Sequence, residues 1–203
     1  MALVYGTNIG FLTTAPTTDP SGSSTLTVDG ASFVLKHTSP STAGMITEIG
    51  WWCDTATSEI NFEVGLYAAN GTVVPGEAGT LLSVSRTNAK GTTAGWKVVS
   101  GLNWSISPDT VYWIGLQVGN TDTTAIDIEA SGGNGFDRKP SQTTLTNPFS
   151  SGALQDADGM VAIYAVWAAV TSNIKTYNTN ALANIKTINT NPIANVKSLN
   201  TNV

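Results

Sequence analysis

The chain has little of what catalysis and metal binding usually require. Its 203 residues contain one cysteine and one histidine. A single cysteine, Cys53, excludes an internal disulfide and a cysteine-rich zinc site, and its strand-like surroundings predict a buried, inert thiol. A single histidine, His37, limits any Ser-His-Asp or Cys-His arrangement to one residue, and no Gly-x-Ser-x-Gly, phosphate-loop or dinucleotide motif accompanies it. We therefore expect no enzymatic activity, no catalytic residues and no cofactor.

Charged residues are also scarce, at 11% of the chain against about 25% in an average soluble domain. Before Asn173 the chain has six basic and fourteen acidic residues, a net charge of −8, whereas the part from Asn173 onward has three lysines and no acidic residue. Nucleic-acid binding needs clustered Lys and Arg to contact phosphates. The acidic body therefore predicts no nucleic-acid partner.

Long apolar runs are absent as well. No stretch approaches the roughly 18 apolar residues of a membrane-spanning helix, so we expect no membrane partner. The first residues, MALVYGTNIGFL, lack the basic region and apolar core of a secretory signal. If the protein acts outside a cell, we expect it to leave by another route, such as lysis.

What the body does contain is alternation of apolar and polar residues with a period of two. The segment 60–67 (INFEVGLY) places Phe62, Val64 and Leu66 on one face, and 111–118 (VYWIGLQV) and 124–130 (TAIDIEA) alternate in the same way. Such alternation indicates half-buried antiparallel strands. Further strands are expected at 31–37, 45–53, 80–87, 95–101 and 159–168.

Turn signals separate these segments, and no stretch before Asn173 has ten residues of helical periodicity. Asn70-Gly71 and Pro75-Gly76 are typical of tight turns. Eight or nine short strands with such connections predict an all-β fold, an antiparallel two-sheet sandwich that is jelly-roll-like. We expect an N-terminal arm at 1–24, the sandwich at 25–170 and a short extended repeat tail at 173–203.

Two groups of acidic residues have the character of calcium-binding loops. One comprises Asp122, Asp127 and Glu129, and the other Asp156 and Asp158. Calcium takes six to eight oxygen ligands, often from alternate residues of a loop. Solvation of an acidic surface explains both groups more simply, so we expect no metal site.

Six tryptophans are many for this length, and two of them are adjacent. Trp51 and Trp52 must point to opposite faces of any strand. One of them therefore leaves the core. A subunit interface, where aromatic residues are enriched, is the favoured explanation, and a carbohydrate-binding surface is the alternative.

The last 31 residues repeat every eleven positions. An eleven-residue apolar period matches a right-handed coiled coil, but nine Asn, five Thr and Pro192 are poor material for a helix. Stacked strand-turn units fit the composition better. Such units bury too little apolar surface alone, so we expect them to dock on copies or partners. The expected assembly residues are Ile174, Tyr177, Ile185, Ile188, Val196 and Leu199.

Residues 33–118 resemble a domain that recurs in bacterial surface proteins and phage structural proteins. The resemblance lies in Leu66-Tyr67, Asn70-Gly71, Pro75-Gly76, Gly79 to Leu82, Gly95-Trp96 with Leu102, and Tyr112 to Ile114. The tail is similar to IK(T/S)-x-N repeats of phage structural proteins. The resemblance implies a jelly-roll-like sandwich in a virion or extracellular setting, and its packing and turn residues imply no catalysis.

These observations predict a non-enzymatic structural protein on the surface of a bacteriophage particle, either a capsid decoration, a fibre or another appendage. Its expected partners are copies of itself, with a trimer as one form suggested by analogy, and other virion proteins. The alternative is a secreted or surface carbohydrate-binding module or adhesin that contacts host glycans. A glycan-cleaving enzyme is the least favoured hypothesis.

Overall fold

The computed structural model describes residues 2–55, 61–70, 78–119, 124–129, 135–149 and 159–170, and the backbone of 154–156. The described segments form strands and turns, with no helix among them. The strands are β1 (Gly10–Leu12), β2 (Ser24–Thr27), β3 (Ala31–Thr38), β4 (Gly44–Thr55), β5 (Asn61–Ala69), β6 (Ala78–Ala89), β7 (Gly95–Ile106), β8 (Val111–Val118), β9 (Ala125–Glu129), β10 (Phe136–Pro140), β11 (Leu154–Asp156), β12 (Met160–Val161) and β13 (Ile163–Ala169). The all-β prediction is therefore confirmed.

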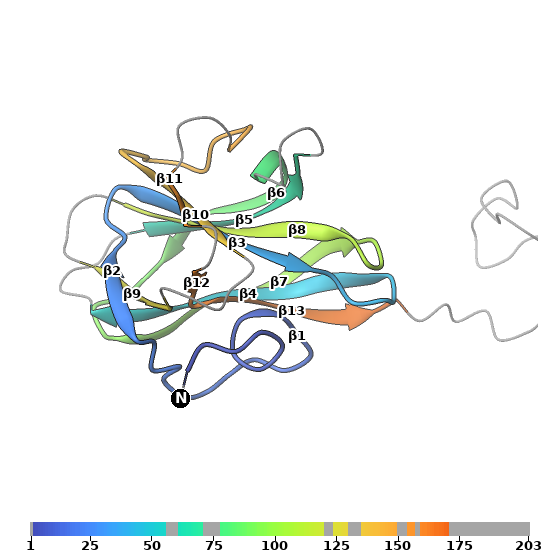
Figure 1. Ribbon diagram of the computed structural model, residues 1–203, viewed down its shortest axis with the longest axis horizontal. Coiled ribbons are helices and arrows are strands. Elements are labelled where there is room, and N and C mark those ends of the chain that lie inside the picture. The colour runs from blue at the N-terminus through green and yellow to red at the C-terminus, as the bar shows by residue number, and fades with distance from the viewer. Residues whose placement is uncertain are drawn as a thin grey trace, which may run out of the picture. The chain divides into compact units, whose positions relative to one another are not determined.

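The strands form two sheets that face each other (Figure 1). We call the seven-stranded sheet, which holds β4, β7, β9 and β13, the lower sheet, and the six-stranded sheet, which holds β3, β5, β6 and β8, the upper sheet. Large side chains from both inner faces make one continuous core. This is the predicted two-sheet sandwich.

The strand order is that of a jelly roll. The lower sheet contains the order β2-β9-β4-β7, and the upper sheet the order β3-β8-β5-β6. Counted one to eight along the chain, these strands lie in the orders 1-8-3-6 and 2-7-4-5, the arrangement of two interleaved Greek keys. Strand β13 pairs with most of β4 on the same edge that β9 extends.

The predicted alternation of the long strands is confirmed on their inner faces. In β5 the side chains of Phe62, Val64 and Leu66 are buried in the core, and in β8 those of Ile114 and Leu116. Burying such side chains contributes about 1.5–3 kcal/mol each. These buried side chains therefore hold the two sheets together.

The outer face of the upper sheet is not open to solvent, contrary to the simplest half-buried pattern. Tyr67 and Trp113 point outward from β5 and β8, yet they are buried in a second apolar cluster with Leu145 and Phe149. The last two residues come from the segment 141–149, which follows β10. This segment covers the sheet and closes that face.

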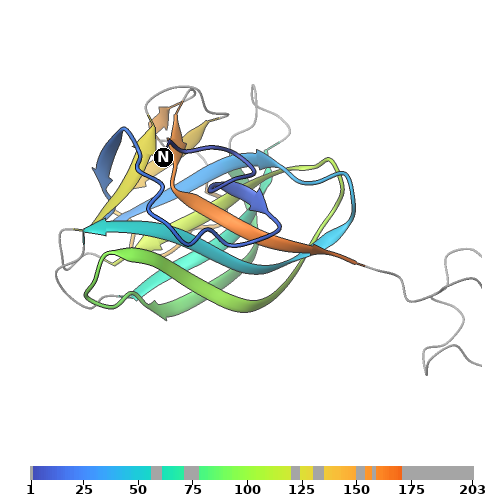
Figure 2. The same ribbon diagram turned by 90° about the horizontal axis from the view of Figure 1, so that it is seen from below.

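The N-terminal residues form part of the sandwich. Strand β1 pairs with β13 in parallel, which is an exception to the predicted antiparallel arrangement. Leu3, Ile9 and Phe11 are buried in the main core. Figures 1 and 2 show this segment against the lower sheet. Met1–Val170 is one compact unit, and the predicted repeat tail at 173–203 lies outside the described residues.

Candidate functional site

The two adjacent tryptophans point in opposite directions, as their neighbouring positions on β4 require. Trp51 is fully buried, and its ring meets Phe62 of the upper sheet edge-on at 5.7 Å between centroids. Trp51 is therefore a core residue and is no candidate for binding a glycan or a subunit. Of these two tryptophans, Trp52 is the one that lies on the outer face of the lower sheet.

Trp52 belongs to an aromatic group on this outer face, together with Trp96 of β7 and Tyr164 of β13. The rings of Trp52 and Trp96 meet edge-on at 5.4 Å, and those of Trp96 and Tyr164 at 5.0 Å. Gly50 makes the group possible, because a Cβ there would lie 2.4 Å from the Tyr164 ring. The sequence pointed to Trp52 but gave no indication that Trp96 and Tyr164 would join it.

Polar contacts hold this aromatic group in place. The Tyr164 hydroxyl donates a hydrogen bond to Glu48 Oε1 at 2.7 Å, and the Trp96 indole N–H donates to the carbonyl of Thr18 at 2.9 Å. Burial, followed by the hydrogen bond to the Glu48 carboxylate, raises the pKa of Tyr164 well above its ordinary value. The Trp52 indole nitrogen is buried and has no hydrogen-bond partner among the described residues. The rings thus pack edge to face with one another, and a hydrogen bond joins Trp96 to the N-terminal segment.

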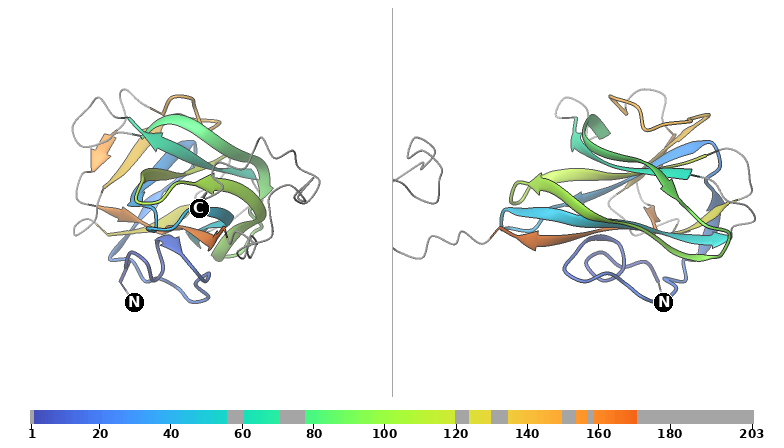
Figure 3. Two further views of the ribbon diagram at one scale, coloured as in Figure 1. Left: turned by 90° about the vertical axis from the view of Figure 1, so that its right-hand side faces the viewer. Right: turned by 180° about the vertical axis from the view of Figure 1, so that it is seen from behind.

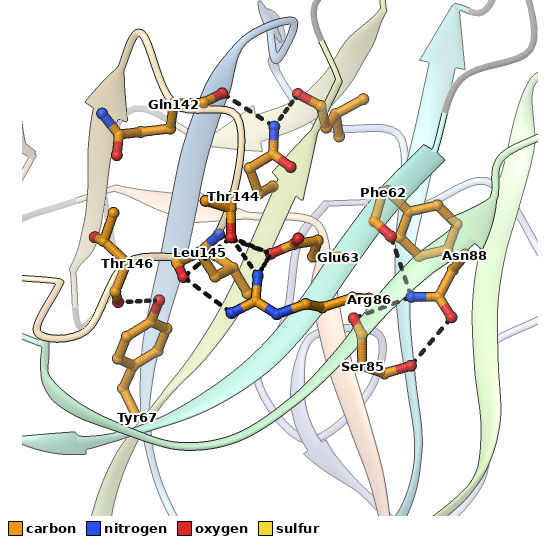
Figure 4. A network of polar contacts seen from close by, with 12 residues as sticks. Phe62, Glu63, Tyr67, Ser85, Arg86, Asn88, Gln142, Thr144, Leu145 and Thr146 are labelled. Atoms are coloured by element: carbon orange, nitrogen blue, oxygen red, sulfur yellow. Dashed lines mark hydrogen bonds and ion pairs between the residues drawn. The ribbon is translucent and has the colours of Figure 1, made fainter.

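The carboxylate of Glu63 lies at the centre of a polar network that fastens the segment 141–149 to the upper sheet (Figure 4). Glu63 Oε2 accepts hydrogen bonds from the Leu145 amide at 2.7 Å and from the Thr144 hydroxyl at 3.1 Å. The same oxygen forms an ion pair with Arg86 Nη1 at 2.5 Å. The Tyr67 hydroxyl adds a bond to the carbonyl of Thr146 at 3.0 Å. This polar network holds the covering segment against the outer face of the upper sheet.

His37 makes structural contacts with the N-terminal segment. Its Nδ1 accepts a hydrogen bond from the Phe11 amide at 2.9 Å, and its ring packs on Tyr5 and Phe11 with centroids 4.7 and 5.7 Å away. Gly10 has a φ of 74° and lies directly against the ring. Burial lowers the pKa of His37 below 6.5. The neutral imidazole therefore anchors the N-terminal segment to β3.

This anchor makes stability depend on pH in a defined direction. Because the pKa of His37 is lower in the folded protein than in the unfolded chain, the contribution is fully present above about pH 6.5 and decreases as the pH falls below that value. Glutamine does not titrate, so in His37→Gln we expect the free energy of unfolding to lack this part of the decrease at acidic pH. At pH 7.5 the variant should be less stable by about 1 kcal/mol, the value of one hydrogen bond, and the difference from wild type should narrow by pH 5.

Urea unfolding at several pH values measures this difference. The carboxylates titrate in both proteins, so subtracting the two curves isolates the histidine. If the difference in free energy of unfolding between wild type and His37→Gln stays constant between pH 7.5 and 5, His37 does not act as a neutral acceptor.

Acidic residues gather where β9 meets β4 and the segment before β2. Burial raises the pKa of Asp127, and the nearby charges of Asp54, Asp19 and Glu129 raise it further. The Gly22 amide, which donates a hydrogen bond to Asp127 Oδ2 at 2.9 Å, lowers it. The net effect of these influences raises the pKa of Asp127. No group of three or more His, Cys, Asp or Glu in the described part of the chain is arranged to hold a metal ion.

Several predicted residues cannot be placed. Asp122 and Asp158 lie outside the described residues, as does the side chain of Asp156. The same holds for the whole set of expected assembly residues, Ile174, Tyr177, Ile185, Ile188, Val196 and Leu199. Within the described segments, no helix is long and apolar enough to cross a membrane.

Comparisons with known proteins leave the chain without an identified relative. No protein-family model, no curated protein and no solved structure matches it.

Proposed function

We propose that the protein is a non-enzymatic structural subunit of a bacteriophage particle, with the jelly-roll body displayed on the surface and the repeat tail serving for assembly or attachment. The observation that carries this proposal is the tail itself. Its eleven-residue repeat brings an apolar residue, a lysine and paired asparagines back three times at the same spacing. Repeats of this kind gain stability by stacking on equivalent units.

The charge distribution supports the same proposal. The tail carries three lysines and no acidic residue, and the body has a net charge of −8. Opposite charges on the docking segment and on the bodies of neighbouring subunits favour encounter and orientation. A tail that docks on other copies is consistent with this asymmetry.

The packing on the outer faces of the body is also consistent with a display role. The segment 141–149 covers one outer face, and the aromatic group of Trp52, Trp96 and Tyr164 is packed edge to face on the other. A carbohydrate-binding module stacks sugar rings on open aromatic faces. Because Trp51 lies in the core and Trp52 packs against Trp96, we place the structural role ahead of the glycan-binding role.

A variant that ends at Val170 tests the role of the tail, since Met1–Val170 is one compact unit with its own core. We expect the shortened protein to keep its unfolding midpoint but to form smaller assemblies. It should also lose binding to bacteriophage particles that were assembled without this protein. Light scattering coupled to size exclusion gives the mass, and sedimentation with particles gives the binding.

A second variant distinguishes the loss of docking contacts from the loss of the tail as a whole. Replacing Ile174, Ile185 and Val196 together by Ser keeps the length and charge of the tail but removes one apolar position from each repeat. If both variants assemble and attach like the full chain, the proposed role of the tail is wrong.

A further inference from the structure

Strand β7 forms a free edge of the lower sheet (Figure 2). It pairs with β4 along its length, and no described residue pairs with its other side. The corresponding edge strand of the upper sheet, β6, lies on the same side of the sandwich (Figure 3). Its edge is partly occupied, because the Phe149 amide donates to the carbonyl of Gly79 and the Leu81 amide to Asn147 Oδ1, both at 3.1 Å. The two edges are therefore not equivalent.

The hydrogen bonds of β4 show which groups of β7 face outward. The Trp52 amide donates to the carbonyl of Ala162 at 2.9 Å, so it points away from β7. Trp52 lies opposite Trp96, and in an antiparallel pair both residues then direct their backbone groups away from each other. The outward N–H and C=O groups on this edge consequently belong to Trp96, Val98 and Ser100.

The stretch Gly95–Ser100 of this edge lacks the features that protect exposed strands. Natural edges usually carry charges, prolines or bulges that prevent pairing with another chain. Gly95–Ser100 has no proline, and its one charged residue, Lys97, is buried and donates from Nζ to the carbonyl of Thr93 at 2.5 Å. Val98 is 44% exposed. A bulge follows at Gly101, with φ 73°, and limits the open stretch to these six residues.

We propose that two copies of the chain pair through this edge, with β7 antiparallel to β7 about a two-fold axis at Val98. In this register Val98 lies opposite Val98, Trp96 opposite Ser100, and Lys97 opposite Val99. The only cation of the stretch therefore meets an apolar side chain instead of its own copy. Roughly six backbone hydrogen bonds form between the outward groups, and the two lower sheets become one continuous sheet.

The partner of this edge is a second copy of the chain because the stretch can pair with itself. A two-fold interface requires the same patch to fit itself, and the stretch Gly95–Ser100 does so without opposing like charges. The exposed Val98 side chains become neighbours on the outer face, beside the Trp52 and Trp96 rings. This interface does not depend on the proposed place of the protein in a particle.

Charge variants at Val98 test the proposal because the residue meets itself only in this register. Val98→Lys and Val98→Glu each place two like charges opposite each other, so each variant alone should have half the mass of the wild-type assembly at tens of micromolar. Mixing the two variants in equal amounts should restore the wild-type mass. Val98→Thr, which keeps both size and backbone groups, should assemble like wild type.

Hydrogen exchange gives an independent result. The amides of Trp96, Val98 and Ser100 should be protected in the assembled wild type and exchange rapidly in Val98→Lys, while those of Lys97 and Val99, which face β4, stay protected in both. Since Val98 is half exposed, circular dichroism should show both charge variants folded. Unchanged masses for the two charge variants, or no recovery on mixing, would overturn the two-fold edge, and the latter result would assign this edge to another partner such as the tail.

Discussion

Replacing Trp51 by alanine should lower the free energy of unfolding by about 3–5 kcal/mol, the usual effect of removing a large aromatic side chain from a core. Trp51 is fully buried and is the point where β4 of the lower sheet meets Phe62 of the upper sheet. Its loss leaves a cavity between the sheets that the extended backbones cannot close. Urea unfolding of the full chain at pH 7.5 measures this loss.

Trp52→Ala is the matched control, because it removes the same side chain from the next position. Trp52 packs on one side against the core and on the other against Trp96, and it is only partly buried. We expect its substitution to lower the free energy of unfolding by less than half as much. An equal or larger effect for Trp52→Ala would contradict the assignment of Trp51 to the core and Trp52 to the outer face.

Removing the Glu63 carboxylate should open the cover of the upper sheet. Glu63→Ala leaves the Leu145 amide, the Thr144 hydroxyl and Arg86 without their common acceptor. Unpaired groups of this kind destabilise a protein by about 1–3 kcal/mol each, and we expect a total loss of about 2–4 kcal/mol. Hydrogen exchange should rise in the segment 141–149 more than in β4.

Arg86→Ala distinguishes the carboxylate from the ion pair. The Arg86 side chain is 43% exposed, and an ion pair in that environment contributes about 0–1 kcal/mol. We expect this variant to keep most of the protection of 141–149. Arg86 also donates to the Thr144 hydroxyl and the Leu145 carbonyl. If Arg86→Ala opened the segment as fully as Glu63→Ala, these contacts of Arg86 and its ion pair, and not the bond from the Leu145 amide to Glu63, would be the main fastening.

Much of the fold follows from local patterns. The strands β5, β8 and β9 were predicted because their segments alternate with a period of two, and their inner faces carry large apolar side chains such as Phe62 and Ile114. Further strand-like segments between turn signals predicted β3, β4, β6, β7 and β13. Turn residues between them set the number of strands. These patterns involve residues that are close to one another in the sequence, so they can be recognised without knowledge of the fold.

Local patterns did not predict that the segment 141–149 covers the upper sheet. The segment 141–149 is rich in Thr, Ser and Asn and shows no periodicity, so it resembles an ordinary loop. The available signal lay elsewhere, in Tyr67 and Trp113, two large aromatic residues on the face opposite Phe62 and Ile114. Their burial required a covering segment, but nothing in their spacing identified which one.

The aromatic group on the lower sheet and the parallel β1 were beyond local reasoning. Trp96 and Tyr164 meet because β7 and β13 flank β4, and β1 pairs with a strand about 150 residues away in sequence. Contacts at that separation depend on topology. Once the register is known, Gly50 explains how the Tyr164 ring fits.

We propose that this protein assembles through two separate elements, the edge at Val98 and the repeat tail. The most direct test is the mass, by light scattering at one concentration, of four proteins: the full chain, Val98→Lys, the variant ending at Val170, and the variant with both changes. We predict the largest assembly for the full chain, half that mass for Val98→Lys, a dimer for the shortened chain and a monomer for the double variant. A monomeric full chain, or four equal masses, would contradict the claim.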